Sequence, residues 1–222
     1  MNDNSNLKNM QIKDDGYYTQ TRPEMLKYIP DSAKKILDVG CGEGTFSKQL
    51  KETNTREIWG IELDEKSAEI AKQKLDKVFV GDVNSLMDKL PDNYFDVIIF
   101  NDILEHLTDP YQILNKIKTK LTPEAIIVSS LPNVRYLLNL VNLIFKKQWK
   151  YEDSGILDKT HLRFFTEKSI IDMFDSLNYE LVKIEGINSI ESWKFKVFNF
   201  LTFGFFSDTK HLQFACVAKP KR

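Results

Sequence analysis

Several features are scarce in this chain of 222 residues, and each absence excludes a class of protein. Two cysteines, Cys41 and Cys216, cannot build a disulfide framework. No uncharged apolar run approaches the roughly 20 residues that cross a bilayer, and the nearest, Val197 to Phe206, is too short. The formal net charge of -1 gives no basic field for nucleic acid. Without a secretory signal, these features predict a cytoplasmic protein.

What is present is typical of a globular protein, with 42% hydrophobic and 28% charged residues. The length suits one large α/β domain better than two small ones. Residues 1–15 are polar and rich in Asn, so we expect a mobile tail. Residues 16–222 are then predicted to form a single domain.

After residue 15, strand-like and helix-like segments alternate, which is typical of a mostly parallel sheet. The predicted strands are Lys35–Val39, Glu57–Ile61, Val78–Val80, Phe95–Phe100, Ala125–Ser129, Tyr179–Ile187 and Gln213–Ala218. The predicted helices run from about Thr45 to Lys51, Glu65 to Leu75, Asp109 to Lys120 and Val134 to Phe145, and from the cap Thr166 onward. Residues 132–165 break the alternation, which indicates an insertion after the fifth strand.

A glycine-rich turn follows the first strand and contains Gly40, Gly42 and Gly44. Glycine allows a sharp turn and lets a ligand approach the backbone without meeting a Cβ. The helix that follows offers free N–H groups at its first turn. Ligands of open α/β sheets bind at the carboxyl ends of the strands, so this turn is a candidate small-molecule site.

Acidic residues follow the next strands. Glu62 ends the second strand, where a carboxylate can accept bonds from ribose hydroxyls. Asp82 follows the third strand and is placed to accept a bond from an adenine amino group, while Asp38 can orient the turn and an amino group of the ligand. A dinucleotide is the alternative ligand, but Thr45 stands where its fingerprint requires a small residue. An adenosine with an amino-acid tail fits the shorter turn better.

The segment from Ile36 to Leu131, and above all Ile-Leu-Asp-Val-Gly-Cys-Gly-Glu-Gly, resembles the class I S-adenosylmethionine-dependent methyltransferases. The resemblance implies a doubly wound, Rossmann-like α/β sheet of seven strands, in the order 3-2-1-4-5-7-6 with strand 7 antiparallel. It also implies S-adenosylmethionine as cofactor. The cofactor contacts so implied come from the glycine loop, Glu62, Asp82, Val83 beside the adenine, and Asn101 near the methionine part.

Two further blocks point to narrower branches of that family. Residues 95–107, Phe-Asp-Val-Ile-Ile-Phe-Asn-Asp-Ile-Leu-Glu-His-Leu, look like the quinone-biosynthesis branch and its relatives. Leu131–Tyr136, Gly155–Thr166 and Arg22–Leu26 are similar to a bacterial branch linked with surface-polysaccharide synthesis. The second similarity favours a sugar or glycan precursor as the acceptor, by association only.

Methyl transfer from a sulfonium is an in-line displacement, so the protein mainly positions the reactants and excludes water. No cluster with metal-ligand spacing is visible in the sequence, and we predict no metal. A hydroxyl acceptor loses a proton, for which His161, with Asp158 orienting it, and His106 are the candidate bases. Arg135 and Arg163 are candidates to bind an anionic acceptor or, equally, to form structural salt bridges. The third histidine, His211, is expected at the surface.

Two apolar segments, Val134–Phe145 within 132–165 and the aromatic stretch 192–206, are predicted to form a cap over the acceptor. An in-plane membrane contact is the alternative, with Lys146, Lys147 and Lys150 facing lipid head groups at the inner face of the membrane. A dimer interface is a third explanation, and the sequence leaves the oligomeric state open.

The sequence therefore predicts an O-methyltransferase that acts on a sugar or glycan precursor. The alternatives are a methyltransferase for a quinone or another small aromatic acceptor, and a protein that binds S-adenosylmethionine without catalysis.

Overall fold

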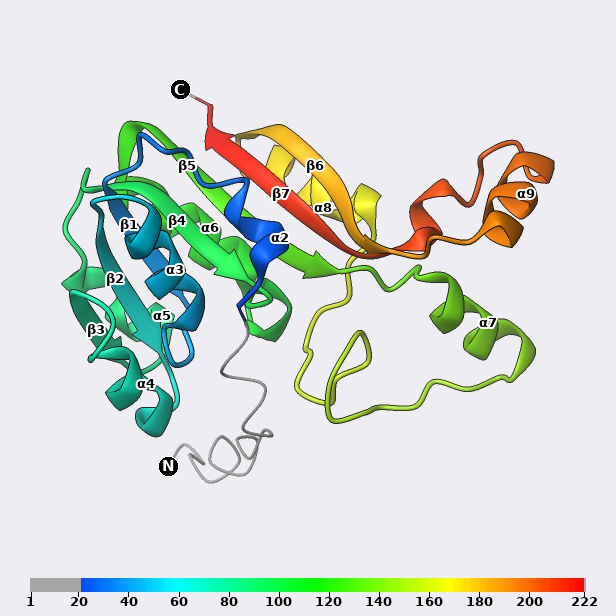
Figure 1. The fold of residues 1–222 in the computed structure, drawn as a ribbon, viewed down its shortest axis with the longest axis horizontal. Coiled ribbons are helices and arrows are strands. Elements are labelled where there is room, and N and C mark those ends of the chain that lie inside the picture. The colour runs from blue at the N-terminus through cyan, green and yellow to red at the C-terminus, as the bar shows by residue number, and fades with distance from the viewer. Residues whose placement is uncertain (1–20, 222) are drawn as a thin grey trace. The chain divides into compact units, whose positions relative to one another are not determined.

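The structure, a computed structural model, describes residues 21–221, so the predicted tail over residues 1–15 lies outside the described residues. Its seven strands form one sheet in the order β3-β2-β1-β4-β5-β7-β6 (Figure 1). Strand β7 (His211–Pro220) is antiparallel to both β5 (Leu121–Pro132) and β6 (Tyr179–Ser189). The predicted strand order and the antiparallel seventh strand are confirmed.

The chain divides into two compact units, which are described separately. The first runs to Phe100 and includes Lys116–Ile126, and the second contains Asn101–Asn115 and the residues from Ile127 onward. Helix α6 (Pro110–Ile117) and strand β5 contribute residues to both. The prediction of a single domain over 16–222 stays a prediction.

The first unit is built on four parallel strands. Strand β1 pairs with β2 on one side and with β4 on the other, and β2 pairs with β3. The apolar residues of β1 and β4 are buried, as expected of central parallel strands with both faces covered. The bounds are β1 Lys35–Val39, β2 Glu57–Glu62, β3 Lys77–Val80, β4 Phe95–Asn101, α2 Pro23–Leu26, α3 Thr45–Thr53, α4 Glu65–Ala71, α5 Val83–Leu86, η1 Met87–Lys89 and η3 Lys118–Lys120.

Local sequence explains where these helices begin. Helix α3 starts directly after the glycine turn, with Gly44 in the left-handed conformation as its N-cap. Helix α4 starts at Asp64, whose carboxylate accepts a hydrogen bond from Ser67 N. Helix α4 packs on β2 and β3, and it ends at Ala71, four residues before the predicted end at Leu75.

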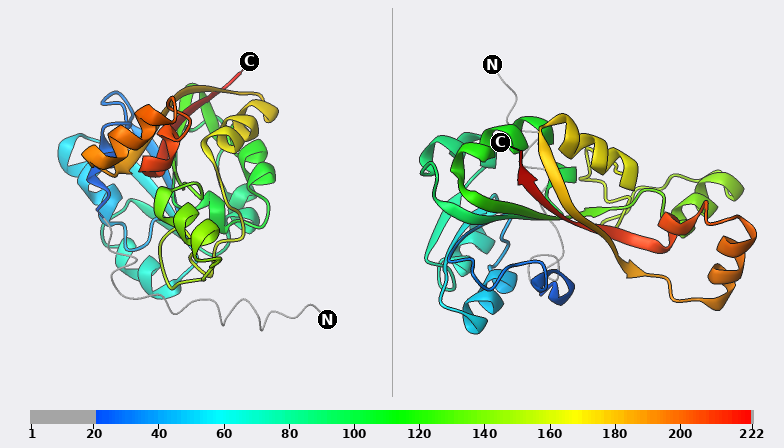
Figure 2. Two further views of the ribbon diagram at one scale, coloured as in Figure 1. Left: turned by 90° about the vertical axis from the view of Figure 1, so that its right-hand side faces the viewer. Right: turned by 90° about the horizontal axis from the view of Figure 1, so that it is seen from above.

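The second unit contains the antiparallel strands and the segments between them. Its elements are η2 Leu104–His106, most of α6, the end of β5, α7 Leu137–Phe145, α8 Glu167–Ser176, β6, α9 Trp193–Leu201, η4 Ser207–Lys210 and β7. Thr166 caps α8 through a reciprocal pair of bonds with Ser169, as predicted for this position. Helix α8 packs on β6. Helices α7 and α9 lie beyond the end of β5, the end of β6 and the start of β7 (Figures 1 and 2).

Strand β5 ends at Pro132, so the segment expected to begin at residue 132 starts one residue later in the structure. Its helix starts at Leu137 rather than Val134, because Asn133 turns the chain. The Asn133 side chain is fully buried, donates to the carbonyls of Asp208 and His211, and accepts from Arg135 N. Within residues 21–221, no helix has both the length and the apolar character needed to cross a bilayer.

Candidate active site

The glycine turn of the first unit has the conformation that its sequence predicts. Gly40, Gly42 and Gly44 have φ angles of 73°, 54° and 74°, a region that residues with a Cβ rarely adopt. The N–H groups of Gly40 and Cys41 both donate to the carbonyl of Ile61 at the end of β2. The turn is therefore fixed to the neighbouring strand.

Glu62, at the end of β2, is held by three backbone N–H groups. One oxygen accepts from Gly42 N at 2.8 Å, and the other accepts from Leu63 N at 2.8 Å and Asp64 N at 2.9 Å. The carboxylate is buried, and this burial raises its pKa although the three donors oppose the effect. Oε1 already accepts two of these bonds and Oε2 only one, so Oε2 of Glu62 retains the capacity to accept one further bond, for example from a ribose hydroxyl.

Asp38 is buried beside the same turn, and its Oδ2 accepts a hydrogen bond of 2.7 Å from the Ser47 hydroxyl. Burial raises the pKa of Asp38 to about 7, with a smaller contribution from the charge of Glu62. Asp82 follows β3, and its side chain makes no cap bond to α5, while Val83 beside it is buried. The first unit thus brings three acids to the carboxyl ends of β1, β2 and β3.

Asn101 ends β4, two residues after Ile99, the residue that pairs with Asp38. Both polar atoms of its amide are buried and have no hydrogen-bond partner among the described residues. A buried amide without a partner costs free energy, which a bound polar ligand would recover.

In the second unit, two histidines and a glutamate come together. The rings of His106 and His161 meet edge to face at 4.6 Å, and Nε2 of His161 lies 3.9 Å from Oε1 of the buried Glu105. The ligand atoms of the three residues lie within 4.8 Å of one another, so this group has the composition to hold a metal ion. The sequence did not reveal it because His161 follows His106 only after a long separation along the chain.

Hydrogen bonds fix the orientation of both rings. Nδ1 of His161 lies 3.0 Å from the carbonyl of Ile156. Nδ1 of His106 lies 3.2 Å from the carbonyl and 3.1 Å from the hydroxyl of Thr160. That hydroxyl donates to Asp158 Oδ1 at 2.6 Å, so its oxygen is the acceptor for His106 and the proton is on Nδ1 of His106. Asp158, which we expected to orient His161, therefore acts on His106 through Thr160.

The two arginines predicted to bind an acceptor have other contacts. Arg135 donates to Asp208 at 2.6 and 3.2 Å in a two-pronged ion pair, which raises the pKa of Arg135. Arg163 is exposed, and one of its nitrogens donates to the carbonyl of Thr108 at 2.7 Å. Arg135 therefore forms a structural salt bridge, which is one of the two roles that the sequence predicted for it.

The third histidine, His211, is half-buried rather than exposed, and it is the first residue of β7. Its Nδ1 lies 2.7 Å from the Ser189 hydroxyl, and its ring covers Gly186, where any side chain would collide with it. Burial lowers the pKa of His211.

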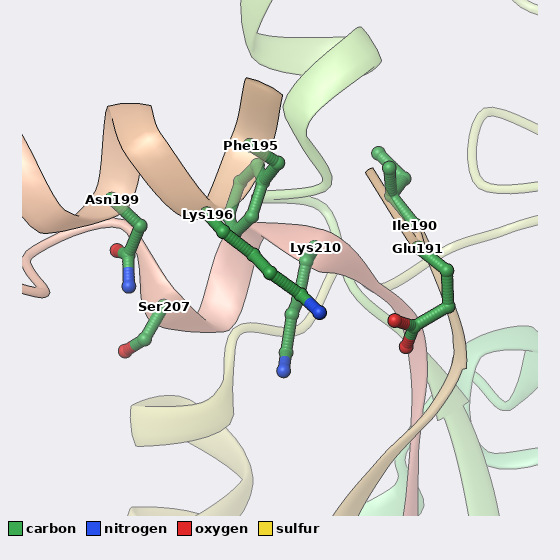
Figure 3. A pocket seen from close by; sticks show the side chains of 7 residues that line it. All are labelled: Ile190, Glu191, Phe195, Lys196, Asn199, Ser207 and Lys210. Atoms are coloured by element: carbon green, nitrogen blue, oxygen red, sulfur yellow. The ribbon is translucent and has the colours of Figure 1, made fainter. Parts of the chain in front are cut away.

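A small pocket of about 100 Å³ lies between the end of β6, α9 and η4 (Figure 3). It is lined by Ile190, Glu191, Phe195, Lys196, Asn199, Ser207 and Lys210. Its volume is below the roughly 300–1,000 Å³ of small-molecule sites, so it does not suit an adenosine-sized cofactor.

Comparison with known proteins identifies the family. The model of the family described as "Methyltransferase domain" matches residues 10–184. The chain belongs to this methyltransferase family. A solved S-adenosylmethionine-dependent methyltransferase from Archaeoglobus fulgidus has the same fold, with a TM-score of 0.65 and 23% identity over 88% of this chain and 91% of that one. A second, from Mesorhizobium loti, has a TM-score of 0.60 and 17% identity over 88% and 95%.

The curated relatives are matched only in part. A ubiquinone biosynthesis O-methyltransferase of Idiomarina loihiensis is 28% identical over 69% of this chain and 65% of its own length. An uncharacterized methyltransferase of Anoxybacillus flavithermus is 36% identical over 43% of this chain and 42% of its own length. The matches thus cover less than two thirds of either relative. Family membership confirms the predicted enzyme class and its cofactor, S-adenosylmethionine, but not the predicted link to polysaccharide synthesis.

The residues present fit S-adenosylmethionine. In the first unit, Gly40, Gly42 and Gly44 present no side chain to an approaching ligand, and Glu62 and Asp82 supply acceptors for hydroxyl and amino groups. In the second unit, the unpartnered amide of Asn101 can bond a polar ligand. The individual contacts of these residues with the cofactor stay predictions.

Sequence reasoning missed three residues of the sites described above. Ser47 bonds Asp38, Thr160 bonds His106, and Glu105 lies beside His161. Ser47 and Thr160 carry no local signal, because a lone hydroxyl in a helix or loop is common. Glu105 precedes His106 directly, so an acid next to a candidate base was the available clue.

Proposed function

We propose that this methyltransferase transfers the methyl group of S-adenosylmethionine to the oxygen of a hydroxyl acceptor. The observation that carries the proposal is the linked set of His106, Thr160 and the buried Asp158 in the second unit. A partly exposed imidazole that donates from Nδ1 presents the lone pair of Nε2, the form that a general base requires.

His106, rather than His161, is the base in this proposal. His161 is buried against Glu105 and Phe164, whereas His106 is half-buried and can reach an acceptor. When His106 takes the proton, the imidazolium is stabilised by the Thr160 hydroxyl and, through it, by the negative charge of Asp158. His161 and Glu105 act as positioning residues that hold the ring from its other side.

The cofactor, when bound, supplies a methyl group already activated by the sulfonium charge. The chain's own residues then have three tasks. Glu62 and Asp82 bind the adenosine part, Asp38 orients the amino group, and His106 removes the acceptor proton as the oxygen attacks. No metal is part of this proposal, although Glu105, His106 and His161 could hold one.

We propose a phenolic hydroxyl, of the kind found in quinone precursors, as the acceptor. The name of the relative from Idiomarina loihiensis supports this class. The sugar acceptor expected from the sequence is less well supported, because Arg135, a candidate to bind an anionic acceptor, is paired with Asp208. A panel with an alkylated catechol and a nucleotide sugar separates the two, with formation of S-adenosylhomocysteine as the readout.

The test of the base uses His106→Asn with the acceptor that the panel identifies. We expect kcat to fall about 10²-fold or more while the affinity for S-adenosylmethionine, measured by calorimetry, is unchanged. Thr160→Val should lower kcat and Thr160→Ser should restore it. The matched control is His211→Asn, which should leave kcat within about twofold. An unchanged kcat in His106→Asn refutes the assignment, and cofactor binding without turnover on any acceptor favours a non-catalytic protein.

A further inference from the structure

The second unit exposes many large apolar side chains on α7, on α9 and on the segment that follows α9. Phe203 is 99% exposed, Phe200 80% and Phe145 78%. Single exposed apolar residues are ordinary, but a concentration of this kind marks a surface that meets an apolar partner. We call it the aromatic surface; it comprises Leu138, Leu143, Ile144, Phe145, Trp193, Val197, Phe198, Phe200, Leu201, Phe203 and Phe205.

Each of the two helices has an inner and an outer face. On the inner face of α7, the buried Asn139 donates a hydrogen bond to the carbonyl of Val134. On the inner face of α9, the ring of the buried Phe195 packs against that of Phe198, with 6.3 Å between the ring centroids. The outer faces carry the aromatic surface. Figures 1 and 2 show both helices beyond the same ends of strands β5, β6 and β7. The outer apolar residues therefore gather at one end of the second unit.

The conformation at Phe203 shows that folding alone does not account for this residue. Its φ is 53°, in the left-handed region that a bulky residue rarely adopts, and its side chain contributes no buried area. Gly or Asn at this position would favour the same turn at the end of α9. Neither the backbone geometry nor burial among the described residues therefore accounts for a phenylalanine at this position.

The charges within the two segments that carry the aromatic surface are all positive. Residues 134–150 and 192–207 contain no Asp or Glu. The charged residues there are Arg135, Lys146, Lys147, Lys150, Lys194 and Lys196. Arg135 is paired with Asp208, whereas the five lysines have no ion pair among the described residues. One more lysine, Lys210, lines the small pocket beside α9 together with Lys196 and the carboxylate of Glu191 (Figure 3).

We propose that the aromatic surface inserts into the head-group region of an anionic lipid bilayer. Apolar side chains flanked by lysines are the combination that binds such a surface in the plane of the membrane. A second copy of the chain is a poorer partner, because a twofold interface would place the same lysines against each other, and residues 134–150 and 192–207 contain no acid to compensate them. The proposal is independent of the acceptor, since it concerns attachment and not transfer.

The experiment is flotation of the full-length protein with vesicles of phosphatidylcholine alone or with about one third phosphatidylglycerol. We expect binding to the anionic vesicles that weakens as salt is added. Phe200→Ser, Phe203→Ser and Phe205→Ser together should weaken binding about 10³-fold, at about tenfold for each ring. The matched control replaces exposed apolar residues elsewhere, Tyr111, Ile171 and Val182, by Ser and should bind like the parent.

A second pair of variants tests the charges. Lys146, Lys147 and Lys150 changed to Gln should weaken binding to anionic vesicles about 10²-fold, at about fivefold for each charge. The same change at Lys66, Lys89 and Lys168, which are exposed elsewhere, is the control. Thermal unfolding confirms that each variant is folded.

Absence of flotation with either vesicle overturns the proposal. So does equal binding by the Phe variant and the parent. A dimer in sedimentation that the Phe variant dissociates, without vesicle binding, assigns the aromatic surface to self-association instead. Because no acceptor or cofactor is present in these assays, their failure leaves the proposed reaction untouched.

Discussion

Asp38→Asn should change how the stability of this protein depends on pH. The carboxyl is buried and its pKa is raised from the usual 3.8 to about 7, mainly by burial. Between these two values the unfolded chain loses its proton while the folded protein keeps it. The folded state then binds more protons than the unfolded state, so the free energy of unfolding falls as the pH rises.

The size of the effect follows from the same numbers. A rise from 3.8 to about 7, at ~1.4 kcal/mol for each pH unit, corresponds to about 4 kcal/mol. Below pH 4 both states are protonated and the contribution vanishes, and above pH 7 it is complete. Asn cannot ionise, so the advantage of the variant over the parent should grow between pH 4 and pH 7 and then stay constant.

Urea unfolding of the variant and the parent at pH 4.5 and pH 8 measures this difference. The dependence of the free energy of unfolding on urea concentration should be the same for both proteins, so that their stabilities can be compared. Asn can still accept the Ser47 bond but adds a buried amino group, a cost that is the same at both pH values. The pH dependence is therefore the test, and not the absolute stability. An equal difference between variant and parent at the two pH values would refute the claim that Asp38 is protonated in the folded protein near neutral pH.

Further predictions concern the cofactor, the metal and the insertion. The ligand's amino group favours the ionised form of Asp38, so the Kd for S-adenosylmethionine should be about tenfold higher at pH 6 than at pH 8. Calorimetry with Asp38→Asn should show no such change. Dialysis against a chelator should leave kcat unchanged; a loss restored by a divalent ion would show that Glu105, His106 and His161 bind a metal. Asn133→Ala should lower the free energy of unfolding by about 3 kcal/mol, at about 1 kcal/mol for each of three lost bonds, and a loss below 1 kcal/mol in urea unfolding would contradict this.

The sheet could be predicted from the sequence because its signals are local. Strands such as Phe95–Asn101 are mostly apolar runs. Turns such as Gly40–Gly44 contain glycines at the positions where the backbone takes a positive φ. The order of the strands came from the family resemblance, because no periodicity in one strand encodes its neighbour. The acids at the strand ends followed from the direction of parallel strands.

The environment of the histidines could not be predicted in the same way. Which carboxylate lies beside a ring depends on how the chain from Gly155 to Phe165 folds back onto η2. The backbone N–H groups of Leu162 and Arg163 both donate to the carbonyl of Glu105, which fixes that approach. These contacts join residues far apart in sequence, and they place Glu105 at His161 and Asp158, through Thr160, at His106.

The aromatic segments show that an apolar sequence does not by itself tell whether its side chains are buried or exposed. From the sequence, apolar helices such as α7 and α9 indicate burial, and a cap over the acceptor was the simplest prediction. The side chains of Phe145, Phe200 and Phe203 are exposed in the second unit, so burial within that unit does not explain them. Removing such rings from water stabilises a complex by about 1.5–3 kcal/mol each, which is a driving force for association and not for folding. The proposed membrane contact thus rests on side-chain exposure, a quantity that no local pattern encodes.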